Sequence, residues 1–154
     1  TIGLKTVRMD DSRWLHCDIK SVSLLGNVLA KQYAVEHGVN DVIQFRNGLL
    51  TEGSSANIWL VKDGVLCAPV KNHLILEGIR YGFMQELAER CGIPFEARDI
   101  SEQEVDQADE LLLTSATKEV LPITQHNGKA VGNGEPGPIY KKLRQAYDEV
   151  VAAL

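Results

Sequence analysis

The chain has 154 residues, of which 44% are hydrophobic and 24% are charged, as is ordinary for a globular domain. Its 16 Lys and Arg against 21 Asp and Glu give a formal net charge of −5, and no basic stripe that would favour nucleic acid is present. No apolar run approaches the roughly 20 residues that span a bilayer, and nothing at the start of this sequence reads as a signal peptide. We therefore expect a cytoplasmic protein with neither a nucleic-acid nor a membrane partner.

The cysteines and histidines indicate neither disulfide bonds nor a metal site. Cys17, Cys67 and Cys91 are widely spaced without a CxxC pair, and no two of the four histidines have metal-ligand spacing. The sequence therefore predicts reduced thiols and no metal site. The chain begins at Thr1 and enters an apolar stretch at once, from which we expect it to be a piece of a longer protein.

Apolar periodicity and turn residues predict strands and helices in succession with short connections. Asn47-Gly48, Asp63-Gly64 and Asn127-Gly128 are strong signals for tight turns between strands. Ser101 followed three residues later by Glu104 predicts a capping box at the start of a short helix. We expect strands at 5–10, 41–45, 49–51, 57–62, 65–70, 95–99, 110–115 and 120–125, and helices at 24–39, 79–91, after 101 and at 138–153.

Lys20 is the first candidate for chemistry, in the run Cys17-Asp18-Ile19-Lys20-Ser21. It lies between an isoleucine and a predicted helix, in a mostly apolar stretch that could shield it from water. Desolvation disfavours the ammonium form and lowers the pKa of lysine, as Schiff-base chemistry requires. On position alone, a solvated lysine at the end of a strand is the more frequent case.

Three further segments carry groups that could hold a ligand. Residues 51–57 (TEGSSAN) place an acid, a glycine and small hydroxyls in a turn between strands. Gly78 precedes a helix whose first N–H groups could bind phosphate, and residues 114–117 (TSAT) end an apolar strand with hydroxyls. A surface loop, a helix cap and a plain turn are the respective alternatives.

Taken in order, these segments resemble the class IV pyridoxal-phosphate aminotransferases, and within them most closely the D-amino-acid type. This resemblance implies an α+β fold with a sheet or barrel-like core and flanking helices. It covers residues 1–154 as one cofactor-binding domain, the C-terminal part of the family's chain. The matching runs are RWLHCDIKS (13–21), LLGNVLA (24–30), TEGSSAN (51–57), LILEGI (74–79) and LTS (113–115).

The resemblance also implies roles for individual residues. Lys20 would form the Schiff base with pyridoxal 5'-phosphate and then carry a proton, and Glu52 would face the pyridine nitrogen. The phosphate would lie on backbone N–H groups at the helix start and in the 114–117 segment. The cofactor-binding residues implied are Lys20, Glu52, Ser54, Ser55, Gly78, Ile79, Arg80, Ser115, Ala116 and Arg13, the role of Arg13 being open.

Two positions depart from the family pattern. Arg80 and Ala116 stand where threonines are common, so a charge replaces one hydroxyl and the other hydroxyl is lost. The family's preceding domain, which supplies further phosphate and substrate contacts, is expected to be absent. We therefore expect little or no turnover from the 154 residues alone.

Three functions stay open at this point. The first is transamination between a D-alanine-like amino acid and a 2-oxo acid, in a homodimer. The second keeps the cofactor but is a branched-chain aminotransferase or an aminodeoxychorismate lyase. The third is a non-catalytic fragment that binds no cofactor, which exposed apolar patches would favour.

Overall fold

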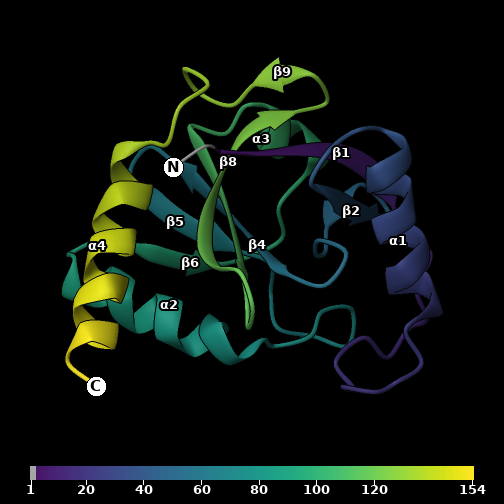
Figure 1. Ribbon diagram of the computed structural model, residues 1–154, viewed down its shortest axis with the longest axis horizontal. Coiled ribbons are helices and arrows are strands. Elements are labelled where there is room, and N and C mark those ends of the chain that lie inside the picture. Colours follow the sequence, from purple (N-terminus) through teal and green to yellow (C-terminus); the bar gives the residue numbers. More distant parts are fainter. Residues whose placement is uncertain (1–2) are drawn as a thin grey trace.

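The computed structural model describes residues 3–154 as a mixed sheet flanked by helices (Figure 1). In these residues the sheet has nine strands and there are four helices. The strands are β1 (Leu4–Asp10), β2 (Asp41–Arg46), β3 (Leu49–Leu50), β4 (Asn57–Lys62), β5 (Val65–Ala68), β6 (Phe95–Ala97), β7 (Glu110–Ser115), β8 (Glu119–His126) and β9 (Lys129–Ala130). The helices are α1 (Leu25–Glu36), α2 (Ile79–Arg90), α3 (Glu102–Asp106) and α4 (Pro138–Ala152).

The sheet curls until its two ends are joined. Its strand order is β3-β2-β1-β8-β7-β4-β5-β6, with β9 paired to β8. Beyond β6 the chain returns to the β2–β3 hairpin, where the Leu50 N–H donates to the Ile100 carbonyl at 2.8 Å and the Glu102 N–H donates to the Gly48 carbonyl at 3.1 Å. This closure produces the barrel-like core that the sequence predicted.

The central strands β4 and β7 are buried on both faces, which explains why they read as nearly continuous apolar runs. Alternate side chains point to opposite sides of each strand. Trp59 and Leu112 belong to the core beneath α2 and α4, whereas Ile58 and Leu113 belong to the core inside the curled sheet. Figure 1 shows α2 and α4 together on one side of the sheet and α1 at the far end against β1 and β2.

The predicted elements are confirmed, with small differences at their ends. β5 ends at Ala68 rather than at residue 70 because Pro69 has no N–H to donate to a neighbouring strand. The capping box is present, since the Glu104 N–H donates to Ser101 Oγ at 3.2 Å and the Ser101 N–H donates to the Glu104 carboxylate at 2.9 Å. The two-residue strand β9 was missed because so short a segment shows no periodicity. Within the described residues, no helix has the length and apolar character needed to cross a membrane.

Helix α4 is anchored by a buried carboxylate. Glu110, the first residue of β7, is 7% exposed and accepts from the Tyr140 N–H at 2.8 Å and the Ile139 N–H at 3.0 Å. These are first-turn N–H groups, which have no acceptor within the helix. A Cβ on Gly137 would lie 2.2 Å from the Glu110 side chain, so the carboxylate can approach the helix only because residue 137 is glycine.

We expect Glu110→Gln to lower the free energy of unfolding by about 1–2 kcal/mol, because an amide offers only one acceptor atom to two buried N–H groups. Urea denaturation should show a lower midpoint at an unchanged slope. The exposed Glu86 of α2 provides a matched control, and Glu86→Gln should leave the midpoint unchanged. Equal midpoints for the two variants would show that the Glu110 cap contributes nothing.

Candidate functional site

A cavity of about 530 Å³ opens where several loops meet, and its volume suits a small-molecule ligand. Four parts of the chain form its walls: the β1–α1 loop, the β3–β4 loop, the start of α2 and the turn that joins β7 to β8. All the predicted site residues except Ser54 line this cavity, namely Arg13, Lys20, Glu52, Ser55, Gly78, Ile79, Arg80, Ser115 and Ala116. A second hollow, of about 580 Å³, lies along α4 and is lined by Pro136 and by both charged and uncharged residues of that one helix.

Lys20 and Glu52 therefore share one cavity, as the resemblance requires. The prediction that Lys20 is shielded from water is wrong for this chain, because its side chain is exposed. The β1–α1 loop buries Arg13 and Cys17 but leaves Trp14, Leu15 and Ile19 about half exposed. Lys20 thus lies at the open side of the cavity, and Glu52 lies at its buried side.

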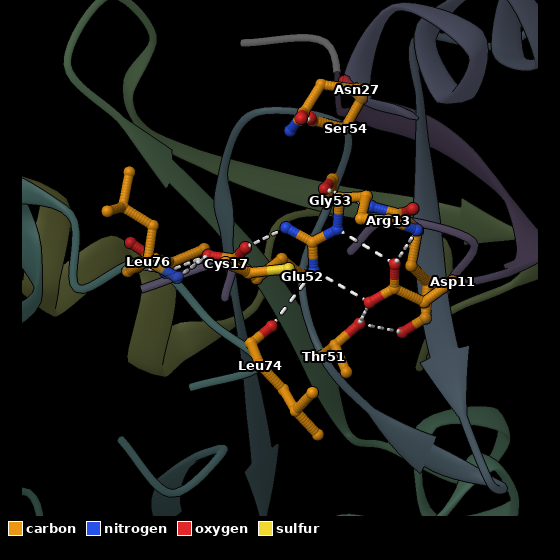
Figure 2. Close-up of polar contacts among 12 residues, drawn as sticks. Asp11, Arg13, Cys17, Asn27, Thr51, Glu52, Gly53, Ser54, Leu74 and Leu76 are labelled. Carbon is orange, nitrogen blue, oxygen red and sulfur yellow. Dashed lines mark hydrogen bonds and ion pairs between the residues drawn. The ribbon is translucent and has the colours of Figure 1, made fainter. Parts of the chain in front are cut away.

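Arg13 forms the centre of a buried charge network (Figure 2). Its guanidinium makes two hydrogen bonds to Asp11, Nε to Oδ1 at 2.9 Å and Nη2 to Oδ2 at 2.8 Å. Nη1 makes an ion pair with Glu52 Oε2, and Nη2 also donates to the Leu74 carbonyl at 3.2 Å. One side chain therefore joins the β1–α1 loop, the β3–β4 loop and the segment before α2.

The second oxygen of Glu52 is held by neutral donors. Oε1 accepts from the Leu76 N–H at 2.9 Å and from Asn57 Nδ2 at 3.2 Å. Asn57 Nδ2 also donates to the Leu76 carbonyl at 2.9 Å. A Cβ on Gly78 would lie 2.4 Å from Asn57 Oδ1, so glycine at residue 78 leaves room for the asparagine that positions Glu52.

Burial and ion pairing shift the pKa values of the acids in this network in opposite directions. Burial raises the pKa of Glu52 to about 7, although the Arg13 charge and the hydrogen bonds from Arg13 and Leu76 oppose the shift. Burial also acts to raise the pKa of Asp11, but the hydrogen bonds and charge of Arg13, with the Thr51 hydroxyl, hold it below its ordinary value. The two carboxyl groups therefore titrate in different pH ranges.

The start of α2 and the β7–β8 turn offer backbone N–H groups to the cavity. Gly78 precedes α2 in an extended conformation, and the Ile79 and Arg80 N–H groups belong to the first helical turn, where no intrahelical acceptor exists. Ser115 Oγ accepts from the Lys118 N–H at 3.0 Å and thereby shapes the β7–β8 turn, residues 116–118. Such N–H groups and the helix dipole attract anions.

Ser54 is buried behind the cavity wall. Its carbonyl accepts from Asn27 Nδ2 at 2.7 Å, and its N–H donates to Asp41 Oδ1 at 3.0 Å. Sequence reasoning assigned no role to Asp11, Asn57 or Asp41, although all three contact predicted site residues. The sequence carried no signal for these contacts, because they depend on packing between segments that are distant in the chain.

Comparison with known proteins decides the family. A match to the family described as amino-transferase class IV spans residues 1–126. The chain belongs to the class IV aminotransferases.

Similar proteins and similar solved structures agree with that assignment. The chain is 40% identical over 149 residues to a D-alanine aminotransferase of Staphylococcus epidermidis, covering 97% of this chain and 53% of the relative. It is 40% identical over 144 residues to a D-alanine aminotransferase of Bacillus licheniformis, covering 94% and 51%. The class IV chain thus spans about half the length of these relatives.

The fold of the class IV chain matches solved branched-chain aminotransferases. With the enzyme of Thermobaculum terrenum in its PLP-form, the TM-score is 0.91 at 29% identity, covering 97% of this chain and 51% of that one. With the enzyme of Thermoproteus uzoniensis with norvaline, the TM-score is 0.90 at 28% identity, covering 97% and 51%. These structures confirm the predicted α+β fold.

The raised pKa of Glu52 predicts a pH-dependent stability. Because the folded chain holds the Glu52 proton more tightly than the unfolded chain, this contribution is fully present below about pH 4.5 and is lost as pH rises through about 7. Asp11 titrates below this window because its pKa is lowered. From about pH 5 to about pH 8, the free energy of unfolding should therefore fall more steeply in wild type than in Glu52→Gln, as measured by denaturant unfolding at each pH. Glu86→Gln should follow wild type, whereas parallel curves for wild type and Glu52→Gln would contradict the raised pKa.

Proposed function

We propose that this chain is the cofactor-holding part of a pyridoxal-phosphate-dependent aminotransferase that acts on D-alanine or a similar D-amino acid and a 2-oxo acid. The observation that carries the proposal is the shared cavity, in which an amine, a carboxylate and a helix start face one ligand-sized space. The family match and the solved relative in its PLP-form support the choice of cofactor.

The residues present fit this cofactor. Pyridoxal phosphate supplies an aldehyde that condenses with an amine, with loss of water, and a protonated ring that accepts electrons. Lys20 would provide the amine, at the open side of the cavity that a substrate amino group would enter. Its Nζ, once free, would take the proton from the substrate Cα as a base and deliver it as an acid to the C4′ carbon of the cofactor.

Glu52 fits the role of the acid beside the ring nitrogen. Its Oε2 accepts one hydrogen bond, from Arg13, and a carboxylate oxygen can accept another. A cationic N–H in the cavity would favour the ionised form of Glu52 and would in turn be kept protonated by it. The donors from Arg13, Leu76 and Asn57 hold the carboxylate in place for this contact.

We assign the phosphate to the N–H groups of Ile79, Arg80 and Ala116. Ser55 lines the cavity, while Ser54 supports the β3–β4 loop from behind. We assign Arg13 to the positioning of Glu52, because its guanidinium is committed to two carboxylates and a carbonyl.

The open side of the cavity suggests that further chain completes it. Around the opening, Trp14, Leu15, Ile19 and Val22 are between 52% and 98% exposed. An apolar patch of this kind marks a contact surface. Since the chain spans about half the length of its relatives, we propose that the remaining half and a second subunit of a homodimer cover this patch and supply the contacts to the substrate.

The covalent role of Lys20 can be tested on this chain. Incubation with pyridoxal phosphate and reduction by borohydride should attach one cofactor to Lys20, located by mass spectrometry of peptides. Lys20→Ala should abolish the attachment, whereas Lys141→Ala on α4 should leave it unchanged. Attachment spread over surface lysines, or retained in Lys20→Ala, would refute the assignment.

The substrate class must be tested in a full-length aminotransferase that includes this chain. We expect that protein to convert D-alanine with a 2-oxo acid at least about tenfold faster, in kcat/KM, than L-leucine, a difference of about 1.4 kcal/mol in transition-state binding. The reason is the greater identity to D-alanine aminotransferases than to branched-chain enzymes. Chiral chromatography of the amino acids measures both reactions, and a preference for L-leucine would select the branched-chain alternative.

A further inference from the structure

Arg80 joins the two walls that face the proposed phosphate position. It lies in the first turn of α2, and its Nε donates to the Ser115 carbonyl at 2.7 Å. Its Nη2 donates to the Ala116 carbonyl at 3.1 Å. The planar guanidinium thus links the helix start to two successive carbonyls at the β7–β8 turn, a geometry that the ammonium of a lysine cannot reproduce.

Holding these carbonyls also fixes the neighbouring N–H groups. In a planar trans peptide the C=O and N–H bonds point in opposite directions. With the Ser115 and Ala116 carbonyls turned toward Arg80, the N–H groups of Ala116 and Thr117 must point away from it. The guanidinium therefore sets the orientation of the donors in the turn without contacting a ligand.

The guanidinium is itself held from the α4 side. Its central carbon lies 5.1 Å from the ring centre of Tyr147, and that of Arg144 lies 5.2 Å from the same ring. Arg144 Nη2 pairs with the Glu119 carboxylate at 2.9 Å. Glu119 immediately follows the turn and has a φ of 59°, a left-handed conformation that costs energy in a residue other than glycine.

The turn is held from the opposite side as well. Lys118 Nζ pairs with the buried Asp41 at 3.2 Å, and Asp41 also accepts from the Ser54 N–H in the β3–β4 loop. The β7–β8 turn is therefore fastened both to the helix start and to the β3–β4 loop. A turn held at both ends in this way has little freedom to reorient its N–H groups.

We propose that Arg80 is a positioning residue that fixes the β7–β8 turn against the start of α2, so that the N–H groups of Ile79, Arg80 and Ala116 converge on one phosphate. This inference rests on the proposed function. It assigns Arg80 to organising the anion site through carbonyl contacts, and it separates this role from a direct pairing of its charge with the phosphate.

Binding should be measured with two ligands, pyridoxal phosphate and pyridoxal, which lacks the phosphate. Arg80→Lys and Arg80→Gln should both raise the Kd for pyridoxal phosphate about tenfold, equivalent to about 1.4 kcal/mol, and leave the Kd for pyridoxal unchanged. The matched control is Arg90→Gln, which removes an exposed arginine from the last turn of the same helix and should bind both ligands as wild type does. Amide hydrogen exchange across residues 115–117 should become faster in Arg80→Lys without any ligand.

The outcomes separate this inference from the proposed function. Wild-type affinity for pyridoxal phosphate in Arg80→Lys would overturn the positioning role and favour direct contact of the charge with the phosphate. Equal losses for both ligands would also overturn it, because the damage would not be specific to the phosphate. If wild type bound neither ligand, the proposed function would fail. Unchanged amide hydrogen exchange at residues 115–117 in Arg80→Lys would show, independently of any ligand, that Arg80 does not fix the turn.

Discussion

The pocket depends on the burial of the Arg13 guanidinium between Asp11 and Glu52. A buried charge that loses its partner costs about 3–5 kcal/mol, and removal of Arg13 would leave the buried Glu52 without its cation and Asp11 with Arg46 alone. The carboxylates come from different loops, and the guanidinium also contacts the segment before α2 through Leu74. Electrostatics therefore brings these three loops to one place, although loops have few regular backbone bonds of their own to position them.

The same network determines what Glu52 can do. A carboxylate in a mobile loop would rotate and be solvated, whereas here each oxygen has a fixed donor, Arg13 on one side and Leu76 with Asn57 on the other. Its pKa of about 7 leaves its charge responsive to what enters the cavity. A ligand that brings a positive N–H would make Glu52 fully ionised, and a neutral ligand would not. The fixed geometry therefore holds the Glu52 carboxylate at one place in the cavity, where it would favour a cationic N–H.

Most of the fold could be predicted from the sequence, because its signals are local. The Asn-Gly and Asp-Gly turns and the capping box at Ser101 each depend on a few adjacent residues, and all of them are confirmed. The family resemblance, rather than the separate segments, brought Lys20 and Glu52 into one site. The exposure of Lys20 and the contacts of Asp11 could not be predicted in this way, because they depend on packing between segments that are distant in sequence.

The two departures from the family pattern, at residues 80 and 116, have a common physical explanation. A lost hydroxyl contact costs about 1 kcal/mol of binding, and a new contact to the same ligand is only one way to recover it. Affinity also rises when the groups that bind are ordered before the ligand arrives, since less entropy is then lost on binding. Arg80 contacts the carbonyl of Ala116, the residue that lacks the hydroxyl, so the exchange at one position acts on the backbone of the other. If Arg80 acts as proposed, a more ordered turn at Ala116 compensates for the side-chain contact that the resemblance implies there.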